Sequence, residues 1–129
     1  MHERVMLVDD NDADLLFTDV VLRARGIASD VLAFDTAQAA LAYLQDEAHP
    51  PVSLILLDIN MPEMDGFAFL SAWDGLCKSR RSAPPVVMLT SSPEPADRAR
   101  ALAHASVRGY LVKPLDDASA RSLLELAAP

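Results

Sequence analysis

The sequence contains a single cysteine, Cys77, among 129 residues. One cysteine cannot form an internal disulfide, which fits a reducing compartment, and its helical spacing from apolar neighbours favours a small core residue. No apolar run approaches the roughly 18 residues of a membrane-spanning helix. The first residues lead directly into a strand pattern, without a visible secretory signal. We therefore expect a cytoplasmic protein that makes no membrane contact.

Basic residues are scarce, because 11 Lys and Arg stand against 19 Asp and Glu, for a formal net charge of −8. This balance argues against a nucleic-acid-binding surface, favours solubility and is compatible with a cation site. Apolar residues make up 51% of the chain, which excludes a disordered protein. The chain shows no linker, repeat or low-complexity segment. Residues 1–129 are therefore expected to form one domain, with no effector domain.

Five short, mostly apolar segments have the pattern of strands. They are Arg4 to Val8, Asp30 to Phe34, Ser53 to Leu57, Pro85 to Leu89 and Val107 to Val112. The intervening segments have the apolar spacing of amphipathic helices. The first helix is expected to bury Ala13, Leu16, Phe17, Val20, Val21 and Ala24. The second and third are expected to bury Ala37, Ala40, Leu41, Leu44, Phe69, Leu70, Trp73, Leu76 and Cys77.

The fourth helix, expected to end near Ala105, has a small apolar face and should be the most weakly held. That face consists of Ala99, Leu102 and Ala103. The last helix is marked by Ala120, Leu123, Leu124 and Ala127. Gly26 suits the C-terminal cap of the first helix, and Thr36 can cap the second. His2, His49 and His104 are expected at the surface, in a tail, a loop and a helix.

Strands that alternate with helices predict right-handed βαβ units and a parallel sheet covered on both faces. Five such units in a chain of this length most often form a flavodoxin-like (βα)5 three-layer sandwich with strand order 2-1-3-4-5. In that order the first and third strands are neighbours, and the chain reverses direction between them. A crevice should therefore open at their carboxyl ends.

Acidic residues follow both strands that border this crevice. Asp9 and Asp10 come directly after the first strand, and Asp58 follows the third. Like charges at a few ångströms raise pKa values or require a cation, and oxygen ligands with open positions suit Mg²⁺. No EF-hand spacing supports calcium, and no Cys/His cluster supports zinc. One aspartate of the pair could instead cap the next helix, although Asp12 is better placed for that role.

Thr90 ends the fourth strand and Lys113 ends the fifth, so both should approach the same crevice. No histidine is placed to activate Thr90, which argues against a nucleophilic hydroxyl. A lysine charge and a threonine hydrogen bond instead suit phosphoryl oxygens. The nucleophile would then be the carboxylate of Asp58, and the product an aspartyl phosphate.

Four motifs, in this order, resemble the receiver domain of two-component response regulators. They are Val8-Asp-Asp10, Leu57-Asp-Ile-Asn-Met-Pro-Glu-Met-Asp-Gly66, Leu89-Thr-Ser91 and Tyr110-Leu-Val-Lys-Pro114. The resemblance covers essentially the whole chain. It implies a single-domain response regulator, not an enzyme, that receives a phosphoryl group from a sensor or hybrid histidine kinase or a histidine phosphotransfer protein. Its output would come through phosphorylation-dependent contacts with a protein.

The resemblance also implies a role for each motif. Asp58 would be the phosphoacceptor, Thr90 and Lys113 would bind the phosphoryl group, and the Lys113–Pro114 bond would be cis. The Mg²⁺ ligands would be Asp9, Asp10, Asp58 and the backbone carbonyl of Asn60. Phosphorylation would draw Thr90 inward and let Tyr110 follow it. The fourth helix, the fifth strand and the last helix would form the responsive face, which is also a candidate homodimer surface.

Two other functions compete with the receiver hypothesis. A haloacid-dehalogenase-type phosphatase also uses an aspartate at a strand end, but its Asp-x-Asp-Gly-Thr motif has a second aspartate where this chain has Asn60. No cap domain is visible either. A pseudo-receiver would be an interaction module without phosphotransfer, and the full set of acceptor, metal and phosphoryl-binding residues argues against it.

Overall fold

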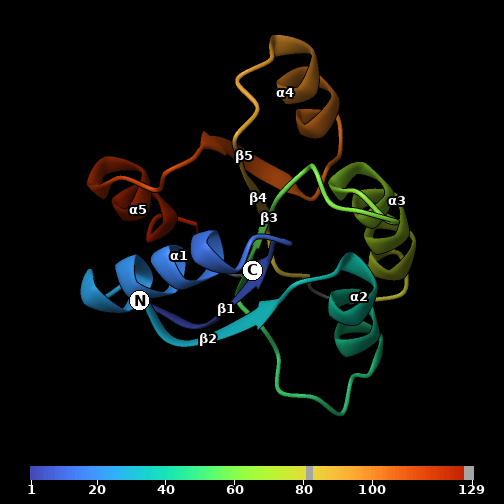
Figure 1. Ribbon diagram of the computed structural model, residues 1–129. Coiled ribbons are helices and arrows are strands. Elements are labelled where there is room, and N and C mark those ends of the chain that lie inside the picture. Colours follow the sequence, from blue (N-terminus) through green and yellow to red (C-terminus); the bar gives the residue numbers. More distant parts are fainter. Residues whose placement is uncertain (81–82, 127–129) are drawn as a thin grey trace.

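Five parallel strands form one sheet in the order β2-β1-β3-β4-β5 (Figure 1), which confirms the predicted flavodoxin-like topology. The structure is a computed structural model that describes residues 1–80 and 83–126. The strands are β1 (His2–Val8), β2 (Ala28–Phe34), β3 (Leu54–Leu57), β4 (Val86–Thr90) and β5 (Val107–Val112). The predicted strands lie within one or two residues of these bounds.

The helices cover the two faces of the sheet and complete the predicted three layers. They are α1 (Asp12–Ala24), α2 (Ala37–Gln45), α3 (Gly66–Cys77), α4 (Pro95–Leu102) and α5 (Asp117–Leu123). Helices α1 and α5 lie on one face, and α2, α3 and α4 lie on the other (Figure 1). Thr36 caps α2 as predicted, since its Oγ1 accepts a hydrogen bond from the Ala39 N–H. Gly26 follows the end of α1 with a φ of 69°, which glycine tolerates best.

Strand β3 is the centre of the core, because each of its side chains is buried on one face or the other. Ile55 and Leu57 join the cluster under α2, α3 and α4, whereas Leu54 and Leu56 join the cluster under α1 and α5. A strand buried on both faces has no reason to alternate between polar and apolar residues. The continuous apolar run that predicted β3 therefore follows from its position in the middle of the sheet.

The prediction for the buried face of α1 was wrong. Leu16, Phe17 and Val20 are 67%, 48% and 56% exposed, whereas Thr18 and Leu22 are buried. Apolar residues recur at helical spacing on two different faces of this helix. The face that packs on the sheet consists of Asp14, Leu15, Thr18, Val21 and Leu22. That face carries two polar residues and therefore looked less apolar. In this orientation Leu22 is buried in the core, and Asp14 reaches Lys113 at the end of the sheet.

Helix α4 is shorter than predicted and ends at Leu102. Its one buried residue is Ala101, and the predicted face of Ala99, Leu102 and Ala103 is exposed. Every other helix in the described ranges buries more residues, which agrees with the expectation of a weakly held α4. In α5, Ala120 and Leu123 are buried as predicted, Leu124 is 42% exposed, and Ala127 lies outside the described residues.

Two histidines depart from the surface positions expected for them. His2 is the first residue of β1 and is buried, with its Nε2 donating to the Leu123 carbonyl at 2.7 Å. The same carbonyl, at the end of α5, also accepts the Leu126 N–H at 3.2 Å, so the His2 side chain adds a second hydrogen bond there and joins β1 to the end of α5. His104 lies in the turn after α4 and is half-buried, with its Nδ1 2.5 Å from the Asp74 carboxylate. It thereby joins that turn to α3.

In residues 1–80 and 83–126, every helix is too short or too polar to span a bilayer.

The packing of α1 can be tested with two leucines of the same helix. Leu22→Ala is expected to lower the free energy of unfolding by about 2–5 kcal/mol, because it leaves a cavity in the core. Leu16→Ala, on the exposed face, should change it by less than about 0.5 kcal/mol. Urea denaturation followed by circular dichroism measures both values. The reverse order would mean that the face predicted from periodicity is the buried one.

Candidate functional site

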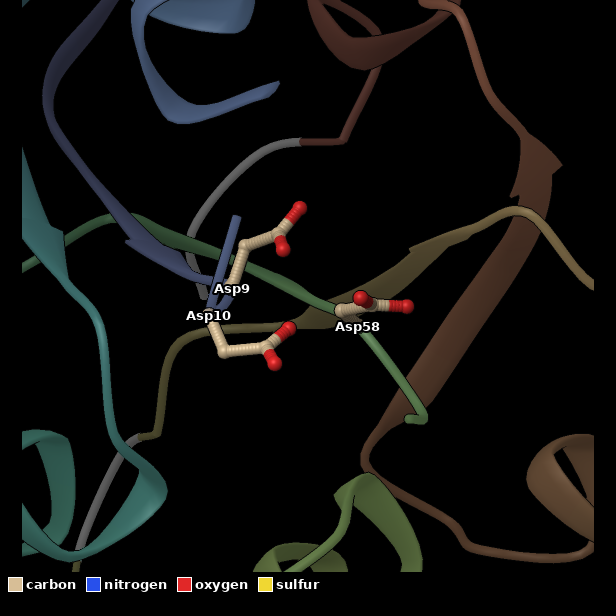
Figure 2. Close-up of side chains that lie close together, drawn as sticks. All are labelled: Asp9, Asp10 and Asp58. Carbon is tan, nitrogen blue, oxygen red and sulfur yellow. The ribbon is translucent and has the colours of Figure 1, made fainter. Parts of the chain in front are cut away.

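Three aspartates meet where β1 and β3 end. Asp9 directly follows β1, and Asp58 directly follows β3, with the Asp58 N–H bonded to the Val8 carbonyl at 2.9 Å. Asp9 and Asp58 are buried, whereas Asp10 is exposed. One carboxylate oxygen from each residue lies within 4.8 Å of the others, and Figure 2 shows the three side chains grouped at the two strand tips. The predicted gathering of these carboxylates is confirmed.

Asp9 is the carboxylate that its surroundings perturb most clearly. Burial raises its pKa above the ordinary value, and the nearby charge of Asp58 acts in the same direction. Hydrogen bonds from Lys113 and from the Asn11 N–H, at 2.9 Å to Oδ1, oppose this shift. These hydrogen bonds therefore offset only part of the effect of burial on the pKa of Asp9. A cation beside Asp9 and Asp58 would supply the missing compensation.

Lys113 is the positive group of the site. Its Nζ lies 2.6 Å from Asp9, 2.8 Å from Asp14 and 3.2 Å from Asp58. Burial opposes its charge, but the hydrogen bonds to Asp14 and Asp9 and the charges of Asp58 and Asp9 outweigh burial and raise the pKa of Lys113. Lys113 is therefore a fixed ammonium group. The Lys113–Pro114 bond that follows is cis, as the resemblance implied.

Asp14 is the one residue of this charged group that the sequence did not single out. It lies in the first turn of α1, where the Asn11 side chain caps the helix by accepting the Asp14 N–H at 3.0 Å. The cap is thus Asn11 and not Asp12, because the Asn11 side chain is the one that reaches the free N–H. The only available signal for Asp14 was an acidic residue shortly after the Asp9–Asp10 pair, and acidic residues are common in any first helical turn.

Thr90 lies on β4, the neighbour of β3, and Tyr110 lies on β5, the next strand of the sheet. Thr90 ends β4 and is fully buried, and its hydroxyl accepts a weak hydrogen bond from the Ser92 N–H at 3.4 Å. Tyr110 in β5 is also buried, and its hydroxyl donates to the Ser92 carbonyl at 2.8 Å. Both residues therefore hold the segment that joins β4 to α4. Ser92 therefore contacts both residues, and it lies in the segment that leads from the tip of β4 to the weakly held helix α4.

The loop from Asn60 to Gly66 brings the start of α3 against the backbone of Asp58. The Gly66 N–H donates to the Ile59 carbonyl at 2.7 Å, and Asp65 caps α3 through the Ala68 N–H. A Cβ at Gly66 would lie 2.4 Å from the Asp58 carbonyl oxygen. Only glycine leaves room for this approach. Asn60 itself is exposed, and its backbone carbonyl stays a predicted metal ligand.

These donors suit a small, hard cation. Three carboxylates from two neighbouring strand tips offer oxygen ligands and leave other coordination positions open, which is the preference of Mg²⁺. The same carboxylates lie beside the Lys113 ammonium group. An anion bound here would therefore contact positive charge from the cation and from Lys113. Oxygen ligands for a cation and an ammonium group for an anion therefore lie within one site.

A family model described as the response regulator receiver domain matches residues 5–125. The relatives of the chain include a sensor histidine kinase and a response regulator. The chain is 37% identical over 115 residues to sensor histidine kinase GacS of Pseudomonas protegens, covering 88% of the chain and 12% of GacS. It is 36% identical over 130 residues to response regulator protein FleR of Pseudomonas aeruginosa, covering 99% of the chain and 24% of FleR. The chain thus spans a quarter or less of these relatives.

Solved structures agree with this match. A two-component response regulator from Cytophaga hutchinsonii superposes with a TM-score of 0.84 at 27% identity, covering 96% of this chain and 95% of that one. The Mn²⁺-bound form of response regulator Rcp1 superposes with a TM-score of 0.72 at 27% identity, covering 95% and 90% of the two chains.

The close approach of α3 to Asp58 can be tested with two glycines of that helix. Gly66→Ala would place a methyl group against the Asp58 carbonyl, and overpacking of this kind costs about 1–3 kcal/mol of folding stability. Gly75→Ala is the matched control, because nothing lies within 4 Å of a Cβ there. It should stabilise the protein by about 0.5–1 kcal/mol through helix propensity. Thermal unfolding of both variants checks the pair, and a Gly66→Ala protein as stable as the wild type would refute the contact.

Proposed function

The chain belongs to the response regulator receiver domain family, and from this premise we propose that it is a phosphoacceptor whose acceptor residue is Asp58. The observation that carries the proposal is the surroundings of that carboxylate. Asp58 is buried at a strand tip, with an ammonium group 3.2 Å away and two further carboxylates beside it. A structural role does not require this concentration of charge.

In the proposed reaction, a carboxylate oxygen of Asp58 attacks the phosphorus of a phosphohistidine on a partner protein. The phosphorus–nitrogen bond of the donor breaks as the new phosphorus–oxygen bond forms, and the released imidazole nitrogen regains a proton from solvent. Lys113 would place its positive charge on a phosphoryl oxygen, and Thr90 would donate a hydrogen bond from its hydroxyl. The reaction ends with an aspartyl phosphate.

A divalent cation fits the same site, and we propose Mg²⁺. Asp9, Asp10 and Asp58 would hold it with side-chain oxygens, and Asn60 with its backbone carbonyl. When bound, Mg²⁺ would neutralise charge on the transferring group. The burial of Asp9 and Asp58 side by side supports this assignment, because buried negative charge is costly and Lys113 supplies one positive charge for both carboxylates. The Mn²⁺-bound form of Rcp1 is a precedent from a related protein.

The output would travel from Thr90 to the face formed by α4, β5 and α5. Thr90 would move toward the phosphoryl group, and Tyr110, which already bonds the Ser92 carbonyl, would stabilise the rearranged β4–α4 segment. Such a change is a shift between two packings. Three large apolar residues are exposed here, namely Leu102 in α4, Val112 in β5 and Leu124 directly after α5. We propose this face as the surface for a downstream protein or a second copy.

The proposed donor is a sensor or hybrid histidine kinase, or a histidine phosphotransfer protein. One relative, GacS, is itself a sensor histidine kinase, and the similarity covers 12% of its length. This similarity is compatible with a pathway that includes such a kinase. We also propose that the chain is a signalling domain and not a turnover enzyme, and that it works in the cytoplasm. The pseudo-receiver and phosphatase alternatives predict different chemistry at Asp58, so one set of assays separates them.

The acceptor assignment is tested with acetyl phosphate and Mg²⁺. The wild-type protein should gain the mass of one phosphoryl group, and Asp58→Asn should gain none, because it lacks the nucleophile. Asp46→Asn, which removes a carboxylate from the α2–β3 loop, is the control and should react like the wild type. Intact-protein mass spectrometry measures all three. A folded but unreactive wild type would favour the pseudo-receiver, and steady hydrolysis of a small phosphate ester would favour the phosphatase.

The metal assignment is tested by stability in Mg²⁺. At a free concentration of 100 times the dissociation constant, a ligand that binds only the folded state stabilises it by about 2.7 kcal/mol. Wild-type protein should therefore melt at a higher temperature in Mg²⁺. Asp10→Asn should need a higher Mg²⁺ concentration for the same shift, because it loses an exposed ligand while the core is unchanged. An identical dependence on Mg²⁺ in both proteins would remove Asp10 from the ligand set.

A further inference from the structure

Asp14 makes the least buried of the three ion pairs of Lys113. The Asp14 side chain is 40% exposed, against 10% for Asp9 and 6% for Asp58. The backbone of Asp14 is held in the first turn of α1, because the Asn11 side chain accepts the Asp14 N–H. The helix in turn sets the direction of the Asp14 side chain. Asp14 also lies outside the group of carboxylates that could share one cation. Asp14 is therefore an ion-pair partner of Lys113 that lies outside the candidate metal site.

The other two partners of Lys113 are both candidate metal ligands. An ammonium group has three hydrogens to donate, and here three carboxylates surround it, with contacts to Asp9 Oδ2, Asp14 Oδ2 and Asp58 Oδ2. A cation between Asp9 and Asp58 would compete with Lys113 for the charge of these carboxylates. Two positive groups beside the same two carboxylates repel each other. Binding of the cation therefore requires that Lys113 give up part of its contact with them.

We propose that Asp14 is a positioning residue that retains the Lys113 ammonium group when a divalent cation takes over the Asp9 and Asp58 carboxylates. This inference rests on the proposed function. The contact with Asp14 lowers the free-energy cost of releasing the other two carboxylates and so strengthens cation binding. It also keeps Lys113 beside Asp58, where the ammonium group is needed for a phosphoryl oxygen. Without Asp14, Lys113 competes more strongly with the cation.

The experiment measures Mg²⁺ affinity by isothermal titration calorimetry. Asp14→Asn is expected to weaken Mg²⁺ binding by roughly three- to fivefold, the range of a partly exposed ion pair. Asp12→Asn is the matched control, because it removes one charge from the same helical turn, and Asp12 forms no ion pair within the described ranges. Its affinity should stay within about 1.5-fold of the wild type, since an exposed charge is well screened.

A second set of proteins separates positioning from a simple loss of negative charge. In a Lys113→Met background, Asp14→Asn should leave Mg²⁺ affinity unchanged, because the residue through which Asp14 acts is gone. A through-space effect would persist at equal size in that background. The double-mutant cycle isolates the part of the effect that passes through Lys113. A general structural role would instead lower the melting temperature and affect both backgrounds.

The ammonium group can also be followed directly. In ¹⁵N-detected NMR spectra of the wild type, the Lys113 ammonium signal should stay protected from exchange at saturating Mg²⁺, because Asp14 still binds it. In Asp14→Asn that signal should broaden. Equal affinities for wild type and Asp14→Asn, or equal losses with and without Lys113, would overturn the inference and leave the phosphoacceptor function standing. A wild type that binds no Mg²⁺ would overturn the proposed metal site, and this inference with it.

Discussion

The Lys113 ammonium group forms ion pairs with three carboxylates at the carboxyl edge of the sheet, and the rest of the site depends on these contacts. Through its contacts with Asp9, Asp14 and Asp58, the side chain joins β5 to the tips of β1 and β3 and to the start of α1. Buried carboxylates without such a partner would be costly. Lys113 stabilises the buried carboxylates when no cation is bound. Under the proposed function it would bind a phosphoryl oxygen when a cation is present.

The sheet makes this arrangement of charge possible. Parallel strands with order β2-β1-β3-β4-β5 bring the ends of β1 and β3 side by side, so that the residues after both strands share one crevice. The burial of β3 on both faces fixes the strand that carries Asp58. Helix α4, by contrast, buries Ala101 alone among its residues, and few buried contacts are typical of a region of low local stability. Under the proposed function, an acceptor carried by a fully buried strand and a weakly held helix would together suit a switch.

Asp9, Asp10, Asp58 and Lys113 could be predicted because each is the first or second residue after an apolar strand, and the strand order determines where strand ends meet. Other features could not be predicted in this way. The face of α1 was assigned wrongly because two faces have the same helical spacing, and spacing alone does not say which one meets the sheet. His2 was expected in a surface tail, but β1 begins at that residue and its side chain bonds the end of α5.

The sequence by itself determined the fold class, the strand order and the carboxylates at the crevice, because hydrophobic periodicity and the position of strand ends are local properties of the chain. Only the tertiary structure decided how α1 is rotated, and hence that Leu16 and Phe17 are exposed while Asp14 reaches Lys113. Asp14 and Lys113 are 99 residues apart in the chain. A contact over that distance depends on the relative placement of a helix and a strand, which packing of the whole core sets.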